Sequence, residues 1–318
     1  MIIVTGAAGF IGSNLVSYLN SKGIDNILAV DDLGSKDKWN NLLGLNFKDL
    51  LSIDQFIDFI NCSKNEDITA LVHLGASSST TERDGDYLHD INYSYTKLLA
   101  NWSLENKIRF IYASSAATYG DGKLGFRDDH QELNTLKPLN AYGFSKYLFD
   151  LYALNNNLLD SIAGIKFFNV YGEREEYKED QASVVFKSFK KILKDSSMEL
   201  FKSTDPKIKD GEQKRDFVYV GDCVKVIHWL IENKNINGIF NLGTGKAQTF
   251  YELTSAVFKA LNINESIKYI DMPAELKSKY QNFTQADITK LRAAGYNEDF
   301  ADLNSGVAKT ISWYQKKS

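Results

Sequence analysis

The sequence is short of cysteine and proline and holds no long apolar run. Its two cysteines, Cys62 and Cys223, lie far apart and outside any Cys-x-x-Cys pair, which excludes a disulfide framework and a metal site built on cysteine alone. The three prolines form no proline-rich linker. No apolar stretch approaches the roughly 18 residues of a membrane span, and no secretory signal opens the chain. We therefore expect a cytoplasmic protein with reduced thiols and no bound metal.

The chain also lacks a dominant charge. Its 37 basic and 41 acidic residues give a net charge of −4, which offers no field to attract nucleic acid. Apolar residues make up 43% of the sequence and charged residues 25%, as is usual for a globular enzyme. A length of 318 residues suits one large α/β domain, alone or with a smaller lobe.

Short apolar runs alternate with helical patterns in the first half of the chain. Such runs are typical of buried parallel strands, and the alternation predicts a doubly wound sheet with helices on both faces. We therefore expect an α/β, Rossmann-type dinucleotide-binding domain over residues 1–170. The predicted strands are residues 2–4, 27–30, 70–74, 109–113 and 162–168, and the predicted helices are residues 11–19, 87–105 and 142–154.

The pattern changes after about residue 170. Residues 173–180 are densely charged and predict a loop, and a lysine-rich helical pattern with a solvated face follows. Strands are predicted at 216–220 and 238–243, with a charged loop over 205–214 before them. These features predict a smaller mixed α/β lobe over residues 171–318 that mainly binds substrate, with some of its elements returning to the first domain.

A glycine-rich turn follows the first predicted strand. Residues 5–12 read TGAAGFIG, and the three glycines allow a tight turn, a close approach of a pyrophosphate and close packing of the following helix. The free N–H groups at the start of that helix would bind the pyrophosphate. Asp31 ends the next strand, where it would accept hydrogen bonds from the adenosine ribose. The turn therefore predicts a dinucleotide site.

The residues after Asp31 leave the nicotinamide cofactor open between NAD and NADP. Asp32 would repel a 2′-phosphate and favours NAD, whereas Lys38 could pair with that phosphate and favours NADP.

A tyrosine and a lysine lie four residues apart in the predicted helix at 142–154. The spacing places Tyr142 and Lys146 on one helix face, one turn apart. An ammonium beside a phenol stabilises the phenolate and lowers its pKa, which suits acid/base catalysis. Ser114 and Ser115 add hydroxyls at the carboxyl edge of the sheet, where α/β folds bind ligands.

Several segments together resemble the extended short-chain dehydrogenase/reductases, the nucleotide-sugar epimerases and dehydratases. They are TGAAGFIG, HLGASSSTTE (73–82), YASSAATYG (112–120) and Tyr142-x-x-x-Lys146. Later segments, FNVYGERE (168–175), KRDFVYVGD (214–222), FNLGTG (240–245) and FTQADITKLRAAGY (283–296), resemble the branch whose members epimerise C6 of an ADP-linked heptose for the lipopolysaccharide core. The similarity covers almost the whole chain, with an apparent insertion around 205–212.

The resemblance implies an NADP-dependent isomerase that removes hydride from C6 of ADP-heptose and returns it to the other face. It implies that Tyr142 and Lys178 are the two acid/bases and that Ser115 and Lys146 complete the catalytic set. The implied cofactor contacts are Gly6, Gly9, Phe10, Ile11, Gly12, Asp31, Asp32, Lys38, Leu74, Gly75, Ala76, Ser77, Ser78, Asn92, Lys146, Val170 and Lys178. The implied substrate contacts are Ser115, Asn169, Asp180, Lys187, Phe201, Lys202, Ser203, Thr204, Arg215 and Tyr280. Arg215 is the best candidate for a diphosphate clamp, because guanidinium matches phosphate oxygens. We also expect a homo-oligomer.

Four positions depart from the family pattern. Asp32 and Ile53 stand where asparagine and lysine are usual, so NAD stays an alternative cofactor. Asp180 and Lys187 stand where serine and histidine are usual, which bears on the substrate. The alternative functions are a UDP-hexose 4-epimerase, which needs no second lysine, and a non-catalytic dinucleotide-binding module, which predicts a broken Tyr-x-x-x-Lys. A 4,6-dehydratase usually carries an acidic pair where Ala116-Ala117 stand, so the sequence disfavours that activity.

Overall fold

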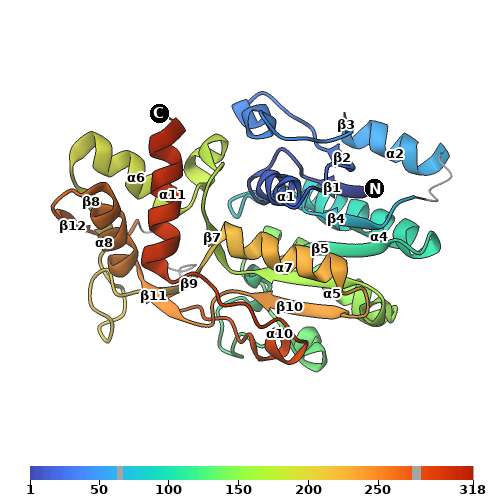
Figure 1. The fold of residues 1–318 in the computed structure, drawn as a ribbon. Coiled ribbons are helices and arrows are strands. Elements are labelled where there is room, and N and C mark those ends of the chain that lie inside the picture. The colour runs from blue at the N-terminus through green and yellow to red at the C-terminus, as the bar shows by residue number, and fades with distance from the viewer. Residues whose placement is uncertain (63–66, 274–280, 318) are drawn as a thin grey trace.

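The computed structural model describes residues 1–62, 67–273 and 281–317, and a seven-stranded sheet is its centre (Figure 1). The strand order is β10-β6-β5-β4-β1-β2-β3, and every neighbouring pair is parallel. This arrangement confirms the predicted Rossmann-type α/β fold. The strands are β1 (Ile2–Thr5), β2 (Ile27–Val30), β3 (Asp49–Leu51), β4 (Ala70–His73), β5 (Arg109–Ser115), β6 (Ala163–Phe167) and β10 (Gly238–Leu242).

Helices cover both faces of this sheet. Side chains alternate along each strand, so that Ile3 enters the core on one face while Ile2 and Val4 enter the core on the other. The first face is covered by α2 (Ile53–Cys62), α4 (Tyr95–Glu105) and α5 (Ala141–Asn155). The second is covered by α1 (Phe10–Ser21), α7 (Val220–Glu232) and α10 (Thr289–Ala293).

A smaller lobe with its own core is built from the later part of the chain. Figure 1 shows α6, β8, β12 and α8 gathered on the side of the molecule away from the N-terminus. Its strands form one sheet in the order β11-β9-β7 and a β12-β8 pair. The elements are β7 (Asn169–Tyr171), α6 (Val184–Asp195), β8 (Met198–Phe201), β9 (Lys214–Tyr219), β11 (Ala247–Thr249), α8 (Phe250–Leu261), β12 (Ile267–Ile270) and α11 (Leu303–Lys317).

Three elements from the later half return to the large sheet. β10 pairs with β6 at the edge of that sheet, α7 packs beside α1, and α10 packs against β10. The predicted division of the chain near residue 170 allows for such returning elements, and it stays a prediction.

Short helical turns differ from the predicted pattern in two places. The helix predicted over 87–105 consists of α3 (Gly85–Leu88), a π-helical turn (His89–Ser94) and α4. The charged segment predicted as a loop contains a 3-10 turn (Glu176–Gln181). Further 3-10 turns span Asp37–Leu42, Ala116–Tyr119, His130–Thr135 and Leu158–Asp160. Among the helices of the described ranges, none is both long and apolar enough to cross a bilayer.

Candidate active site

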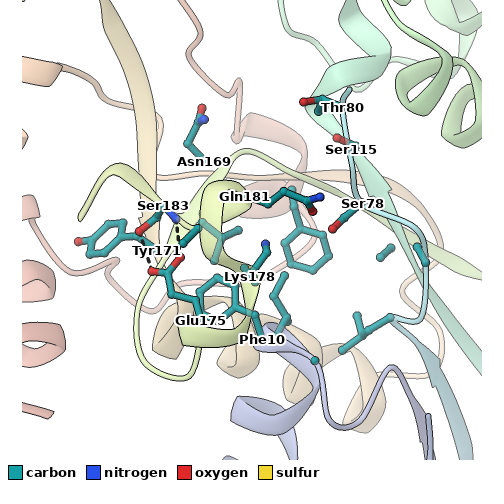
Figure 2. A pocket seen from close by; sticks show the side chains of 18 of the residues that line it. Phe10, Ser78, Thr80, Ser115, Asn169, Tyr171, Glu175, Lys178, Gln181 and Ser183 are labelled. Carbon is teal, nitrogen blue, oxygen red and sulfur yellow. Dashed lines mark hydrogen bonds between the residues drawn. The ribbon is translucent and has the colours of Figure 1, made fainter. Parts of the chain in front are cut away.

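A cleft of about 760 Å³ lies between the large sheet and the smaller lobe. One wall is formed at the carboxyl ends of β1, β2, β4, β5 and β6, the edge at which such folds bind ligands. The other wall comes from residues 175–185 and from β9 and α8 (Figure 2). Most of the predicted site residues line this cleft: Gly6, Gly9, Phe10, Ile11, Gly12, Asp31, Lys38, Leu74, Gly75, Ala76, Ser77, Ser78, Ser115, Tyr142, Lys146, Asn169, Val170, Lys178 and Arg215.

The glycine turn is closely packed against its neighbours. Gly6 has φ +67°, and a Cβ there would lie 2.7 Å from the backbone nitrogen of Gly75. A Cβ on Gly12 would lie 2.0 Å from the Gly6 carbonyl oxygen, so a side chain fits at neither position. Helix α1 begins directly after Gly9, and its first amide, on Phe10, donates to the Tyr177 hydroxyl at 3.0 Å. The start of α1 therefore already engages a hydrogen-bond acceptor inside the cleft.

The two aspartates after β2 have different surroundings. The Asp31 carboxylate lines the cleft, accepts the Ala8 N–H at 2.9 Å and forms an ion pair with Lys38 at 2.8 Å. Asp32 lies outside the cleft lining and accepts the Ile53 N–H at 3.0 Å, at the start of α2. Lys38 therefore sits beside the predicted ribose position, while Asp32 caps a helix.

Asn92 braces the wall of the cleft from behind. Its side-chain amide donates to the Ser77 carbonyl at 2.9 Å and accepts the Ser77 N–H at 2.9 Å. The same amide donates to the Ser145 hydroxyl of α5 at 2.9 Å. Asn92 lies in the π-helical turn, buried outside the cleft lining, so the structure places it behind Ser77.

Tyr142 and Lys146 face the cleft from the first turns of α5. The Asn140 side chain caps this helix by accepting the Gly143 N–H at 2.7 Å. Burial lowers the pKa of Lys146 to about 8, against an opposing effect of Asp150, and its ammonium donates to the Ala113 carbonyl at 2.9 Å. Burial raises the pKa of Tyr142, and a hydrogen bond with Ser115 opposes that rise. The lowering of the Tyr142 pKa by Lys146 stays a prediction.

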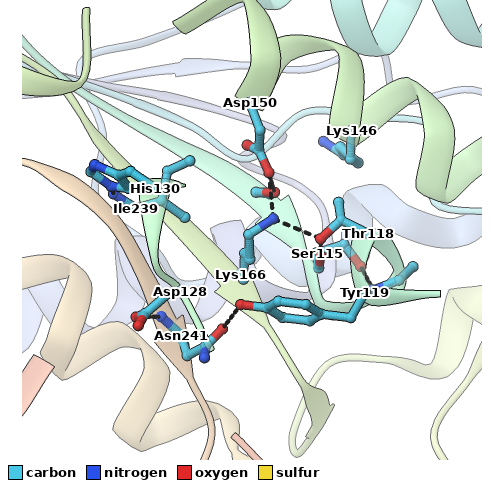
Figure 3. A network of polar contacts seen from close by, with 12 residues as sticks. Ser115, Thr118, Tyr119, Asp128, His130, Lys146, Asp150, Lys166, Ile239 and Asn241 are labelled. Carbon is cyan, nitrogen blue, oxygen red and sulfur yellow. Dashed lines mark hydrogen bonds and ion pairs between the residues drawn. The ribbon is translucent and has the colours of Figure 1, made fainter. Parts of the chain in front are cut away.

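A buried polar network supports this catalytic wall (Figure 3). Lys166 of β6 lies 2.5 Å from the Asp150 carboxylate and 2.6 Å from the Thr118 hydroxyl, and both charged side chains are fully buried. Asp150 also accepts the hydroxyls of Tyr112 at 2.9 Å and Ser114 at 2.8 Å. Because Asp150 is one turn beyond Lys146 and Thr118 follows Ser115, the network joins the two segments that carry the predicted catalytic residues.

Lys178 enters the cleft from the 3-10 turn on the lobe side. Its ammonium lies 5.4 Å from the centre of the Phe10 ring. Burial lowers the pKa of Lys178, and the Glu175 carboxylate raises it. The structure therefore brings Lys178 into the same cleft as Tyr142, although 36 residues separate them in the sequence.

Some predicted substrate residues lie away from the cleft lining. The exposed Lys187 donates to the Asp180 carbonyl, Lys202 forms an ion pair with Asp271 at 3.1 Å, and the Ser203 hydroxyl donates to the Asp205 carbonyl at 2.9 Å. Phe201, the last residue of β8, and Thr204 flank Lys202 and Ser203. Tyr280 lies outside the described residues. The binding roles assigned to these positions stay predictions.

The sequence reasoning missed cleft residues on the charged segment after β7. They include Glu175, Tyr177, Gln181 and Ser183. The only sequence signal for them is their proximity to Lys178 in a segment that the charge pattern marks as a solvated loop.

The comparisons with known proteins agree with this geometry. A family model described as the NAD dependent epimerase/dehydratase family matches residues 2–243. The ADP-L-glycero-D-manno-heptose-6-epimerase of Nitratidesulfovibrio vulgaris is 49% identical over 315 residues, covering 99% of this chain and 98% of the relative. The Fusobacterium nucleatum protein with the same description is 45% identical over 327 residues, covering 100% of this chain and 98% of the relative.

Solved structures give the same fold. The crystal structure of Helicobacter pylori ADP-L-glycero-D-manno-heptose-6-epimerase has a TM-score of 0.83 at 27% identity, covering 99% of this chain and 96% of that chain. The UDP-glucose 4-epimerase of Thermotoga maritima, solved with UDP-glucose, has a TM-score of 0.81 at 25% identity, covering 99% of both chains. Backbone similarity alone therefore separates the two kinds of epimerase very little, and the side chains of the cleft must separate them.

Proposed function

The chain belongs to the NAD dependent epimerase/dehydratase family, and from that premise we propose that it epimerises C6 of an ADP-linked heptose. The substrate would be ADP-D-glycero-D-manno-heptose and the product ADP-L-glycero-D-manno-heptose. The observation that carries the proposal is the presence of Lys178 in the cleft with Tyr142 and Ser115, in a chain 45–49% identical to curated 6-epimerases.

The turn between β1 and α1 fits a nicotinamide dinucleotide. Gly6 and Gly12 leave no room for a Cβ, the amino end of α1, whose dipole favours an anion, lines the cleft, and Asp31 stands in the cleft where a ribose would lie. When bound, the dinucleotide supplies hydride removal at C6 and hydride return. The chain's own residues would orient the sugar and move protons at the C6 oxygen.

Two acid/bases suit this reaction because the two stereoisomers present the C6 hydroxyl in different directions. Tyr142 approaches from α5, and Lys178 approaches from the lobe side. Tyr142 would exchange a proton with the C6 oxygen of one isomer, and Lys178 with that of the other. Ser115 would hold the Tyr142 hydroxyl, and the buried Arg215 would bind the diphosphate.

The test is turnover of the two rival substrates by the purified protein. With ADP-D-glycero-D-manno-heptose, proton NMR is expected to show the C6 epimer accumulating to an equilibrium mixture, with no net change in nicotinamide absorbance at 340 nm. UDP-glucose is expected to stay unchanged under the same conditions. Formation of UDP-galactose without turnover of the heptose would select the 4-epimerase alternative.

We propose NADP as the cofactor, with Lys38 forming an ion pair with its 2′-phosphate. The negative charge of Asp32 would repel that phosphate and so disfavour NADP. Asp32→Asn is expected to shift the preference towards NADP by about 1 kcal/mol, roughly fivefold in relative affinity. Asparagine keeps an oxygen that can accept the Ile53 N–H, so α2 stays capped. The measurement is the ratio of NADP to NAD dissociation constants, together with mass spectrometry of the nucleotide released on denaturation.

Asp49→Asn is the matched control for that substitution. Asp49 is an exposed carboxylate at the amino end of β3, whereas the cleft lies at the carboxyl ends of the strands. Loss of its charge should therefore leave the ratio of the NADP and NAD dissociation constants unchanged. A shift towards NAD in Asp32→Asn would refute the electrostatic argument.

The proposed product would supply heptose to the lipopolysaccharide core. Cytoplasmic location and homo-oligomeric assembly stay predictions.

A further inference from the structure

One buried carboxylate ties together both ends of the segment that carries Lys178. Glu175 is fully buried, and its oxygens accept the Ser183 N–H at 2.5 Å, the Ser183 hydroxyl at 2.6 Å and the Gly172 N–H at 3.4 Å (Figure 2). Gly172 follows β7, and Ser183 is the N-cap of α6. Burial raises the pKa of the Glu175 carboxyl, and the hydrogen bonds from Ser183, the charge of Lys178 and the hydrogen bond from Gly172 oppose that rise by favouring the ionised form. The segment 172–183 is therefore closed into a loop around this buried carboxyl.

The backbone of the same segment is fixed at two further points. The Tyr314 hydroxyl of α11 accepts the Glu175 N–H at 3.3 Å and donates to the Gly172 carbonyl at 3.1 Å. The Lys178 N–H donates to the Glu175 carbonyl at 3.0 Å. The backbone of Lys178 is therefore hydrogen-bonded to Glu175, and the side chain of Glu175 holds the two ends of the loop that carries Lys178.

The charge of Glu175 acts on Lys178 through space, since the hydrogen bonds given above for the Glu175 oxygens come from Ser183 and Gly172. Burial lowers the pKa of Lys178, and Glu175 is the group that raises it. The other titratable groups in the cleft lining come from the segment after β2, from α5, β7 and β9, and from the 3-10 turn that carries Lys178. They are Asp31, Lys38, Tyr142, Lys146, Tyr171, Tyr177 and Arg215.

We propose that Glu175 is a positioning residue for Lys178, which fixes the loop that carries the amine and keeps the amine able to hold a proton. This inference rests on the proposed acid/base role of Lys178. A reversible two-base epimerase needs each base to act as an acid in one direction. A lysine shielded from water loses its proton readily, and a neighbouring carboxylate opposes that loss. Glu175 would thus let Lys178 return a proton as well as remove one.

The test compares Glu175→Gln with Glu173→Gln in the holoenzyme. Glu173 is a buried carboxylate two residues earlier, and it accepts the Tyr219 hydroxyl at 2.6 Å. Lys178 is acetylated with trace acetic anhydride across a range of pH, and mass spectrometry of its peptide gives the midpoint at which the amine becomes reactive. Glu175→Gln is expected to move this midpoint to lower pH, and Glu173→Gln is expected to leave it in place. The acid limb of kcat/KM should move with the midpoint in Glu175→Gln.

Glu175→Asp keeps the charge but shortens the side chain. It is expected to hold the labelling midpoint near the parental value while lowering kcat, because the loop is closed less tightly. A folded Glu175→Gln with the parental midpoint overturns the inference. If Glu175→Gln does not fold, a midpoint in Glu175→Asp well below the parental value overturns it, and a parental midpoint supports it.

Failure of the proposed function gives a different result. Parental turnover in Lys178→Met would remove Lys178 from the chemistry, while the labelling midpoint would still report whether Glu175 controls its proton. Loss of turnover in Lys178→Met, with an unmoved midpoint in Glu175→Gln, would sink the positioning role alone.

Discussion

Tyr142→Phe and Lys178→Met are each expected to lower the rate of C6 epimerisation by about 10²–10⁴-fold, the usual contribution of a positioned acid/base. Each substitution removes one proton-transfer group from the cleft and keeps most of the side-chain volume. The measurement is kcat with ADP-D-glycero-D-manno-heptose at saturating concentration, with bound dinucleotide quantified in every variant. Lys194→Met, on an exposed lysine of α6, is the matched control and should turn over at the parental rate.

A half-reaction separates the two bases. Given the 6-keto form of the substrate and enzyme loaded with the reduced dinucleotide as hydride source, each single variant should still reduce C6 but give one C6 epimer in excess, because only the base that returns a proton to that epimer is intact. Lys146→Met should lose both epimers, since Lys146 lines the cleft one turn after Tyr142 and would hold the nicotinamide ribose that both directions use. Parental epimerisation by Lys178→Met would mean that Lys178 is not an acid/base, and the hexose 4-epimerase would become the leading alternative.

The large sheet was predictable because its strands are buried on both faces. The run at 27–30 matches β2 residue for residue, and the glycine turn and the Tyr142–Lys146 spacing lie where the local pattern predicts. These features depend on neighbours in the sequence. The break of the helix at 87–105 was not predictable, because its π-helical turn carries Asn92, whose contacts are with distant segments: two hydrogen bonds with Ser77 and one with Ser145 of α5.

The unpredicted part of the site depends on contacts between distant segments. The Tyr177 hydroxyl meets the Phe10 N–H across 167 residues, and Glu175 has Tyr314 as a neighbour across 139. In the sequence, residues 173–180 show only a run of charge, which is typical of a solvated loop. Hydrogen bonds with Tyr314 of α11 and with Ser183 at the start of α6 hold Glu175 of that run against the lobe, and part of the run forms a wall of the cleft. The surroundings of Asp32 were not predictable either, because the hydrogen bond that its carboxylate accepts from the Ile53 N–H depends on the pairing of β2 with β3.

Lys166→Met is expected to lower the free energy of unfolding by about 3–5 kcal/mol, the cost of leaving a buried charge without its partner. Among the residues that the structure describes, the substitution leaves the Asp150 carboxylate the Tyr112 and Ser114 hydroxyls as donors, and both charged side chains of the pair are fully buried. Chemical denaturation of the holoenzyme, followed by tryptophan fluorescence, measures the change.

Two further variants show whether burial is the cause. Lys36→Met removes one partner of the exposed Lys36–Glu179 ion pair and should cost less than about 1 kcal/mol, because water screens that pair. Combining Lys166→Met with Asp150→Asn should recover part of the lost stability, since a neutral amide still accepts the Tyr112 hydroxyl and leaves no buried charge. If Lys166→Met costs no more than Lys36→Met, water reaches the Asp150–Lys166 pair, and this network cannot be the rigid support behind Lys146 and Ser115.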